Sequence, residues 1–309
     1  MKILVTGGAG FIGKHLVLAL LDNGDSVTIY DNLSKGSEEK INFLKTKGAK
    51  FVKGDITDYE SLCSVMEDGI DSVVHLAAKT GVVDSVKYPE ETHHINVTGT
   101  VRLLRACVEK NVNNIVIASS GAVYGESKKL PLSEELPNIP LSPYGASKIC
   151  AEKYVQAFSN SYGINGVSLR FSNVYGEGQS KDYAGVITKF MDDIEKDKPL
   201  IIFGDGEQTR DFVFVEDVAA GIKKALENIS GKNGNFYNIA TEKQTSVEEL
   251  AKIMLSISGK SLEIIHEKPR EGEIKHNYAS IELAKKELGY FPKIELREGL
   301  KKLLLENKN

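Results

Sequence analysis

The chain has 309 residues, of which 41% are hydrophobic and 27% are charged. It carries 39 Lys and Arg residues against 43 Asp and Glu residues, so the formal net charge at pH 7 is -4. This composition excludes collagen, coiled-coil and disordered chains, and it argues against nucleic acid as a partner because nucleic-acid-binding domains usually carry a basic face. The length predicts two domains, or one large domain with an appendage.

The cysteine pattern and the first residues favour a cytoplasmic protein. The three cysteines, Cys63, Cys107 and Cys150, are widely spaced and form no CxxC motif. We therefore expect neither disulfides nor a metal site, but three packed thiols in a reducing compartment. The start of the chain has no signal-peptide pattern, and its longest apolar run, residues 16–21, is far shorter than the roughly 20 residues that span a bilayer. We expect no membrane contact.

Short, nearly continuous apolar segments alternate with helical periodicity through the first half of the chain. Strands are predicted over residues 2–6, 26–30, 50–53, 72–76, 114–119 and 167–171, and helices over 13–23, 59–67, 91–110 and 143–162. This order predicts an α/β fold built on a Rossmann-type doubly wound parallel sheet with helices on both faces.

The pattern loosens after about residue 173, where loops rich in Gly, Asp and Glu appear. We predict a first domain over residues 1–172, with elements returning to it from about 212–240. Residues 173–309 would mainly form a smaller α/β C-terminal substrate domain, which ends in an amphipathic helix over 296–309.

A glycine loop directly follows the first predicted strand and opens the first predicted helix. In TGGAGFIG (residues 6–13), Gly7 permits a tight turn, Gly10 lets the backbone approach a pyrophosphate, and Gly13 allows close helix–strand packing. The helix N-terminus adds free N–H groups and the positive end of the helix dipole. The loop therefore predicts dinucleotide binding.

Asp31 ends the second predicted strand, 24 residues beyond Gly7. A carboxylate at this place accepts hydrogen bonds from both ribose hydroxyls and repels a 2′-phosphate, which favours NAD over NADP. No Arg follows it, and Lys35 is the nearest cation in the sequence. Taken alone, Asp31 could equally be a helix cap or a turn residue.

Tyr144 and Lys148 are four residues apart, so they share one face of the predicted helix. A free tyrosine titrates near pH 10, and a nearby ammonium together with an oxidised nicotinamide would favour its phenolate. Ser120, at the end of the strand before this helix, could orient the proton of the substrate. A YxxxK spacing also occurs by chance, as an exposed helix pair, but its position in this chain favours an acid–base pair.

These motifs resemble those of the extended short-chain dehydrogenase/reductase family along nearly the whole chain. The matching strings are TGGAGFIG (6–13), GDIT (54–57), HLAA (75–78), SSGAVYG (119–125), SPYGASK (142–148) and RFSNVYG (170–176). Within the family, the strings FGDGEQTRDFVFVEDVA (203–219), PREGEIKHNYAS (269–280) and ELGYFP (287–292) are most similar to the UDP-galactose (UDP-glucose) 4-epimerases.

The resemblance implies a tightly held NAD contacted by Phe11, Ile12, Asp31, Asn32, Asp55, Ile56, Leu76, Ala77 and Ala78. Asp55 would meet the adenine, and Asn96 would support the cofactor side of the site. The resemblance also implies that Asn173, Arg210 and Arg270 bind the UDP moiety. Two arginines suit a diphosphate because each planar guanidinium can hold two oxygens, although either arginine alone would be read as a surface residue. Ser172 and Glu177 depart from the family pattern.

The reaction implied is NAD-dependent 4-epimerisation of a UDP-hexose by an isomerase. Tyr144, as a phenolate, would take the proton of the 4-hydroxyl, and the transient 4-keto sugar would turn before hydride returns. The alternatives are UDP-glucuronate 4-epimerase, decarboxylase or dehydratase, and a non-catalytic NAD-binding sensor. Dehydratases carry an acidic pair after the Ser or Thr, where this chain has Gly121 and Ala122, and a sensor would lack the Tyr/Lys pair.

Two further expectations follow from the resemblance. The helices over 91–110 and 143–162 would form an intersubunit bundle in a homodimer. Asn277, seven residues after Arg270, would line the pocket at the sugar 2-substituent, where a large Tyr excludes N-acetyl groups. We therefore expect activity on UDP-glucose and UDP-galactose, with some on UDP-GlcNAc and UDP-GalNAc. A register slip of one residue would place Tyr278 there instead and reverse the prediction.

Overall fold

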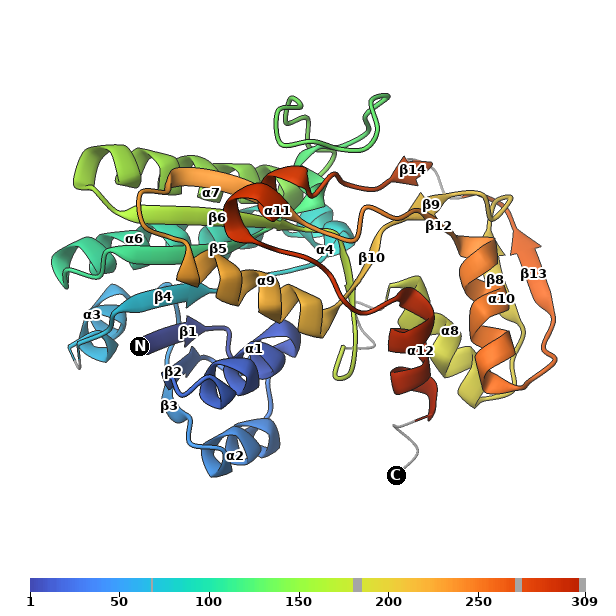
Figure 1. Cartoon of the computed structure of the whole chain (residues 1–309), viewed down its shortest axis with the longest axis horizontal. Helices are drawn as coiled ribbons and strands as arrows, with labels where there is room; N and C mark the ends of the chain where they lie inside the picture. Colours follow the sequence, from blue (N-terminus) through green and yellow to red (C-terminus); the bar gives the residue numbers. More distant parts are fainter. Residues whose placement is uncertain (68, 180–184, 270–273, 306–309) are drawn as a thin grey trace.

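A seven-stranded parallel sheet forms the centre of the molecule in the computed structural model, which describes residues 1–67, 69–179, 185–269 and 274–305 (Figure 1). The strand order is β11-β6-β5-β4-β1-β2-β3. The strands are β1 (Lys2–Thr6), β2 (Ser26–Asp31), β3 (Lys50–Lys53), β4 (Ser72–His75), β5 (Asn114–Ser120), β6 (Asn165–Phe171) and β11 (Asn233–Ile239). The predicted Rossmann-type sheet is confirmed. Because the strand order reverses beside β1, a crevice opens there at the carboxyl ends of the strands.

Helices cover both faces of the sheet and bury one apolar cluster on each side. One face carries α1 (Phe11–Asp22), α2 (Glu38–Thr46), α9 (Val215–Glu227) and α11 (Glu282–Leu288). The other carries α3 (Tyr59–Val65), α6 (Gly99–Glu109) and α7 (Pro143–Tyr162). β1, β4 and β5 are buried along most of their length, with apolar centres, because both of their faces are covered.

The helix α7, which carries Tyr144 and Lys148, is capped at both ends by residues that favour the start and the end of a helix. The Ser142 hydroxyl accepts a hydrogen bond from the Gly145 N–H, and Pro143 is the first helical residue. Gly163 closes the helix with a φ of 73°, in the left-handed region that glycine adopts without steric cost. The predicted range 143–162 agrees with these bounds.

The helix predicted over 91–110 agrees with the structure to within two residues, because helical backbone runs from α5 (Pro89–His93), where Pro89 is the first helical residue, to the end of α6 at Glu109. The sequence analysis missed two features, which are a separate short helix before it, α4 (Val82–Lys87), and a π-helical turn within it over His94–Thr98. Such wide turns often occur at functional sites, and this one contains the buried Asn96.

The second half forms a smaller body with its own apolar cluster. Its elements are β7 (Asn173–Tyr175), α8 (Val186–Glu195), β8 (Leu200–Phe203), β9 (Thr209–Arg210), β10 (Phe212–Phe214), β12 (Thr245–Ser246), α10 (Val247–Ser258), β13 (Ile264–Glu267), β14 (His276–Asn277) and α12 (Leu296–Leu305). The chain returns to the large sheet through α9 and β11 between β10 and β12, and again through α11 before α12, so several chain crossings rather than a single linker join the two parts (Figure 1).

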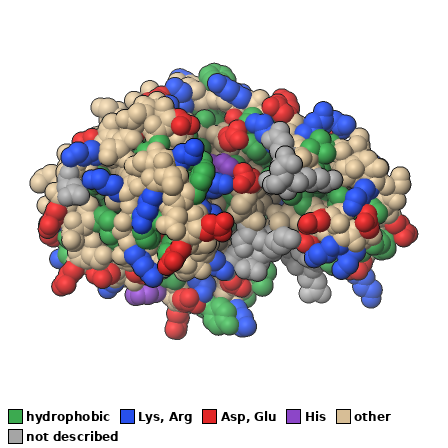
Figure 2. Space-filling view, turned by 90° about the horizontal axis from the view of Figure 1, so that it is seen from below, with side chains coloured by type: hydrophobic (Ala, Val, Ile, Leu, Met, Phe, Trp, Pro, Cys, Tyr) green, Lys and Arg blue, Asp and Glu red, His purple; other side chains and the backbone are tan. Residues whose placement is uncertain are grey.

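The surface carries charges of both signs. Figure 2 shows Lys and Arg side chains interspersed with Asp and Glu on the face seen from below. None of the helices in the described residues is long and apolar enough to cross a membrane. Cys63 and Cys107 are buried free thiols, but the expectation that all three cysteines are packed is wrong for Cys150, which is exposed on α7.

Candidate active site

The glycine loop between β1 and α1 brings backbone very close to the end of β4. Gly7 has a φ of 72°, and a Cβ placed there would lie 2.6 Å from the Ala77 nitrogen. A Cβ on Gly13 would lie 2.4 Å from the Gly7 carbonyl oxygen. Only glycine fits at either place. Gly10 caps α1 without a side-chain hydrogen bond, so the first N–H groups of the helix are left for an anionic ligand.

A cleft of about 1220 Å³ runs from this loop along the carboxyl edge of the sheet to the start of α7. Of the residues predicted to bind the cofactor, it is lined by Gly7, Gly10, Phe11, Ile12, Gly13, Asp31, Asn32, Asp55, Ile56, Leu76, Ala77, Ala78, Tyr144 and Lys148. A cleft of this size with one apolar wall and a glycine cradle fits a dinucleotide.

Asp31 lies in the cleft at the end of β2, with its carboxylate held by backbone. The Ala9 N–H donates to one oxygen at 3.0 Å and the Leu33 N–H to the other at 2.7 Å. Burial raises the pKa of Asp31, while these two hydrogen bonds and the charge of Lys40 act in the opposite direction. Lys40, five residues beyond Lys35, is therefore a cation that the linear sequence does not place beside Asp31.

Asp55 and Asn32 are hydrogen-bonded to each other in the lining of the cleft. The Asn32 amide donates to the Asp55 carboxylate at 2.8 Å, and Thr57 donates to it through both its N–H and its hydroxyl. Burial raises the pKa of Asp55, but these hydrogen bonds outweigh that effect and hold it below its ordinary value. The carboxylate therefore stays charged and fixed in orientation.

Tyr144 and Lys148 lie one helical turn apart, beside the end of β5. The Lys148 ammonium donates to the Ala118 carbonyl at 2.9 Å and lies 5.8 Å from the centroid of the Tyr144 ring. Burial lowers the pKa of Lys148 to about 8, and Glu152 acts in the opposite direction. Ser120 stands at the end of β5, where its hydroxyl accepts the Ala122 N–H at 3.2 Å.

The acidity of Tyr144 differs from the sequence expectation. Burial raises the pKa of this phenol above 10, and a hydrogen bond with Ser120 only opposes that shift. A partly dehydrated phenol stays neutral unless positive charge lies close to its oxygen, and the charge of Lys148 does not outweigh the burial here. Formation of a phenolate therefore depends on further positive charge in the cleft.

Asn96 does not line the cleft but fixes one of its walls. Its side-chain oxygen accepts the Lys79 N–H at 2.7 Å, and its amide donates to the Lys79 carbonyl at 3.0 Å. The same amide donates to the Ser147 hydroxyl on α7 at 3.0 Å. The π-helical turn thus connects the strand-end segment after β4 with the helix of Tyr144, which is a supporting role.

Three of the residues expected to bind the UDP-sugar, two at UDP and Asn277 at the sugar, lie in short paired strands of the smaller body. Asn173 pairs with Phe212 between β7 and β10, and Arg210 pairs with Asn277 between β9 and β14. Asn173 is exposed, whereas Arg210 and Asn277 are half-buried. Directly paired residues of neighbouring strands point to the same side, so Asn277 shares the face of Arg210, while Tyr278 follows the end of β14. Arg270 lies outside the described residues.

The cleft also contains residues that the sequence analysis missed, among them Ser34, Lys35, Gly36, Lys40, Lys79, Thr80, Phe171, Val174 and Gln179. Lys79 was detectable, because it directly follows Leu76–Ala78. Glu177, noted as a departure, forms an ion pair with Lys14 at 2.9 Å, and its carbonyl oxygen lies 2.9 Å from His15 Nε2. It thereby joins the segment after β7 to α1. The described residues contain no cluster of His, Cys, Asp and Glu suited to a metal ion.

Comparison with known proteins matches residues 3–240 to the NAD dependent epimerase/dehydratase family. A Methanocaldococcus jannaschii protein, provisionally named a UDP-glucose 4-epimerase, is 45% identical over 309 residues, or 99% of this chain and 98% of its own. The Thermotoga maritima UDP-glucose 4-epimerase, solved with UDP-glucose, has a TM-score of 0.92 and 37% identity, and the match covers 97% of this chain and 96% of that one. A UDP-N-acetylglucosamine 4-epimerase from Methanobrevibacter ruminantium, solved with UDP-N-acetylmuramic acid, has a TM-score of 0.93 and 34% identity over 100% and 99% of the two chains.

Proposed function

Because the chain belongs to the NAD dependent epimerase/dehydratase family, we infer that it is an NAD-dependent isomerase that inverts carbon 4 of a UDP-hexose. The observation that carries this inference is that Tyr144 and Lys148 lie together in the lining of the cleft, with the Ser120 hydroxyl hydrogen-bonded to Tyr144 although Ser120 itself does not line the cleft. A binding-only protein has no need for a phenol, a hydroxyl and an ammonium at that place.

Tyr144, Ser120 and Lys148 have different roles in the transfer of one proton. The glycine loop and Asp31 would hold NAD in the cleft, and bound NAD would supply reversible hydride exchange with carbon 4, so the cycle would have no net redox change. The Tyr144 oxygen takes the proton of the 4-hydroxyl and later gives it back, with Ser120 orienting both oxygens. Lys148, held by the Ala118 carbonyl, supplies positive charge beside the phenol and can reach a ribose hydroxyl. General acid–base help of this kind is worth about 10²–10⁴-fold in rate.

We propose UDP-glucose and UDP-galactose as the main substrates, with weaker activity on UDP-GlcNAc and UDP-GalNAc. Asn173, Arg210 and Arg270 would hold UDP while the keto sugar turns. Asn277, which pairs with Arg210, would line the space beside the sugar 2-substituent. Its side chain is smaller than Tyr, and its amide can hydrogen-bond an acetamido group.

The related reactions that need extra acids are less well supported. A dehydratase or decarboxylase would need carboxylates directly after Ser120. Gly121 and Ala122 stand there, in a short helical turn over Gly121–Val123. Neither residue can add or remove a proton, so only epimerisation is served by the groups at this end of the cleft. UDP-glucuronate remains the alternative epimerase substrate.

We propose further that the protein works as a cytoplasmic homodimer. Apolar side chains are exposed on α7 and on the neighbouring α4, namely Tyr154 and Tyr162 of α7 and Val86 of α4. Pairing of α6 and α7 with their counterparts would cover them. The free thiols favour a reducing compartment. Light scattering of the purified chain at twice the monomer mass would support the dimer.

The activity is tested with a coupled assay of purified protein on a panel of UDP-hexoses, without added NADH. We expect interconversion of UDP-glucose and UDP-galactose with cofactor that copurifies. Turnover of UDP-glucuronate alone would show that the enzyme is a UDP-glucuronate 4-epimerase instead. Absence of any sugar-dependent reduction of the cofactor would indicate the non-catalytic sensor instead.

A further inference from the structure

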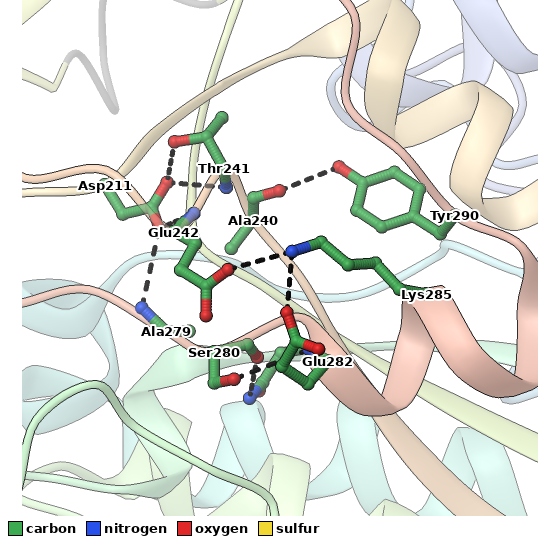
Figure 3. A network of polar contacts seen from close by, with 10 residues as sticks. Asp211, Ala240, Thr241, Glu242, Ala279, Ser280, Glu282, Lys285 and Tyr290 are labelled. Carbon is green, nitrogen blue, oxygen red and sulfur yellow. Dashed lines mark hydrogen bonds and ion pairs between the residues drawn. The ribbon is translucent and has the colours of Figure 1, made fainter.

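Asp211 is a fully buried carboxylate on which four hydrogen-bond donors converge (Figure 3). One oxygen accepts the N–H of Thr241 at 2.9 Å and its hydroxyl at 2.6 Å. The other accepts the Glu242 N–H at 3.0 Å and the Ala279 N–H at 3.4 Å. Burial raises the pKa of Asp211, and these hydrogen bonds act in the opposite direction. The carboxylate is thus held by backbone and hydroxyl dipoles of two distant segments.

The same residue touches each strand that carries a described candidate for UDP binding. Asp211 directly follows Arg210 in the chain, and its carbonyl oxygen accepts the Asn173 N–H at 3.0 Å. The Ala279 N–H that it binds belongs to the segment two residues beyond Asn277. One residue therefore connects its own strand with two segments whose contacting residues, Asn173 and Ala279, are 38 and 68 positions away from it in the sequence.

The segment over residues 240–242 is held in an unusual conformation by this network. Glu242 has a φ of 62°, which is unfavourable for a residue other than glycine. Its N–H is bound by Asp211, and its carboxylate pairs with Lys285 at 3.1 Å. The Tyr290 hydroxyl donates to the Ala240 carbonyl at 3.0 Å (Figure 3). The hydrogen bonds to Asp211 and the contacts of Glu242 and Ala240 thus hold this segment in place despite the unfavourable backbone conformation of Glu242.

We propose that Asp211 is a positioning residue of the UDP-sugar site, setting the spacing of the Asn173, Arg210 and Asn277 strands before the substrate arrives. The proposal rests on the proposed function, because it takes these three residues to bind the UDP-sugar. The residues that hold the diphosphate and those that contact the sugar must lie at a fixed distance from one another, because both ends of the same substrate bind at once. Asp211 provides that separation without touching the ligand, because its backbone carbonyl accepts the Asn173 N–H while its carboxylate accepts the Ala279 N–H.

The test compares two isosteric variants in the NAD-loaded protein. Asp211→Asn keeps the shape of the side chain but turns an amide toward some of the donors. Asp217→Asn is the matched control, because Asp217 is also buried and accepts the N–H groups of Lys293 and Ile294 at 2.9 Å, away from these strands. Titration calorimetry with UDP should show affinity at least about tenfold weaker for Asp211→Asn and within about twofold of wild type for Asp217→Asn. The KM for UDP-galactose should rise with a smaller change in kcat.

A milder pair of variants serves if Asp211→Asn does not fold. Thr241→Val removes only the hydroxyl donor at 2.6 Å, and Thr241→Ser restores it. We expect UDP affinity to fall in the first variant and to return in the second.

Three outcomes distinguish a failure of the positioning role of Asp211 from a failure of the proposed UDP-sugar site. Normal UDP affinity in Asp211→Asn, with weakened affinity in Arg210→Ala, overturns the positioning role and leaves the UDP site in place. Normal affinity in Arg210→Ala as well shows that the UDP site itself is misplaced. Equal weakening in Asp211→Asn and Asp217→Asn would mean general loosening of the fold, and it also overturns the proposal.

Discussion

Glu152 and Arg170 form an ion pair that is almost wholly enclosed between α7 and β6. Arg170 Nε donates to one carboxylate oxygen at 2.9 Å and Nη2 to the other at 2.7 Å. Glu152 stands one helical turn beyond Lys148 on α7, and it also accepts the hydroxyl of Ser119. The pair therefore ties the helix of Tyr144 and Lys148 to the two strands beside it.

Glu152→Ala should destabilise the protein by about 3–5 kcal/mol, because it leaves the Arg170 guanidinium buried without a counter-charge. Urea denaturation at pH 7 measures the loss. The double variant Glu152→Met/Arg170→Met leaves no isolated charge and should lose less than the single variant. A single variant as stable as wild type would contradict this account of the pair.

Wild-type protein should bind NAD far more tightly than NADP, because the Asp31 carboxylate accepts ribose hydroxyls and repels a 2′-phosphate. Asp31→Ala should weaken NAD by about tenfold or more and strengthen NADP, since Lys40 then faces the phosphate without competition. Asp55→Asn is the control and should weaken both cofactors alike. Calorimetry that gives equal affinities of wild type for the two cofactors would refute the role of Asp31.

Tyr144→Phe should nearly abolish epimerisation while UDP-galactose still binds, because the hydroxyl moves the proton and the ring only packs. Turnover is measured by the coupled assay and binding by calorimetry. Tyr154→Phe, on the exposed face of the same helix, should keep wild-type activity. If Tyr144→Phe retains more than about a tenth of wild-type kcat, another group is the base.

Asn277→Tyr should suppress the reaction on UDP-GlcNAc by steric exclusion and leave UDP-galactose turnover largely intact. The ratio of the two kcat/KM values is the measurement. Tyr278→Ala, directly after the end of β14, should leave the ratio unchanged. If wild type has no detectable activity on UDP-GlcNAc at high enzyme concentration, the assignment of Asn277 is wrong.

His75 should make the fold sensitive to acid. It is buried between the hydroxyls of Thr6 and Thr100, and burial lowers its pKa to about 3, with the charge of Lys148 adding to the shift. Between about pH 6.5 and pH 3 the unfolded chain binds a proton that the folded chain does not, so stability falls as pH falls through this window.

Lowering the pH from 7 to 5 should therefore remove about 2 kcal/mol through His75. His75→Asn should lose that much less than wild type over the same interval, as measured by denaturant titration at both pH values. The exposed His93→Asn variant should behave as wild type. An equal loss in wild type and His75→Asn would show that other groups cause the acid sensitivity.

Local patterns allowed much of the large sheet to be predicted. The six predicted strands agree with the structure to within about two residues, because each is short, apolar and bounded by turn residues. The helix of Tyr144 was predictable to the residue from Ser142, Pro143 and Gly163. The π-helical turn was not, because its signal is the contact of Asn96 with Lys79, which lies 17 residues away.

The sequence by itself determined the glycine loop and the Tyr144/Lys148 pair, since both depend on spacings within one turn or one helix. Only the tertiary structure decided that Lys40 faces Asp31, that Asn277 shares the face of Arg210, and that Asp211 joins three strands. These relationships arise from strand register and from packing between segments far apart in the chain. No local pattern encodes them, because each partner has an ordinary local context until the fold brings the two together.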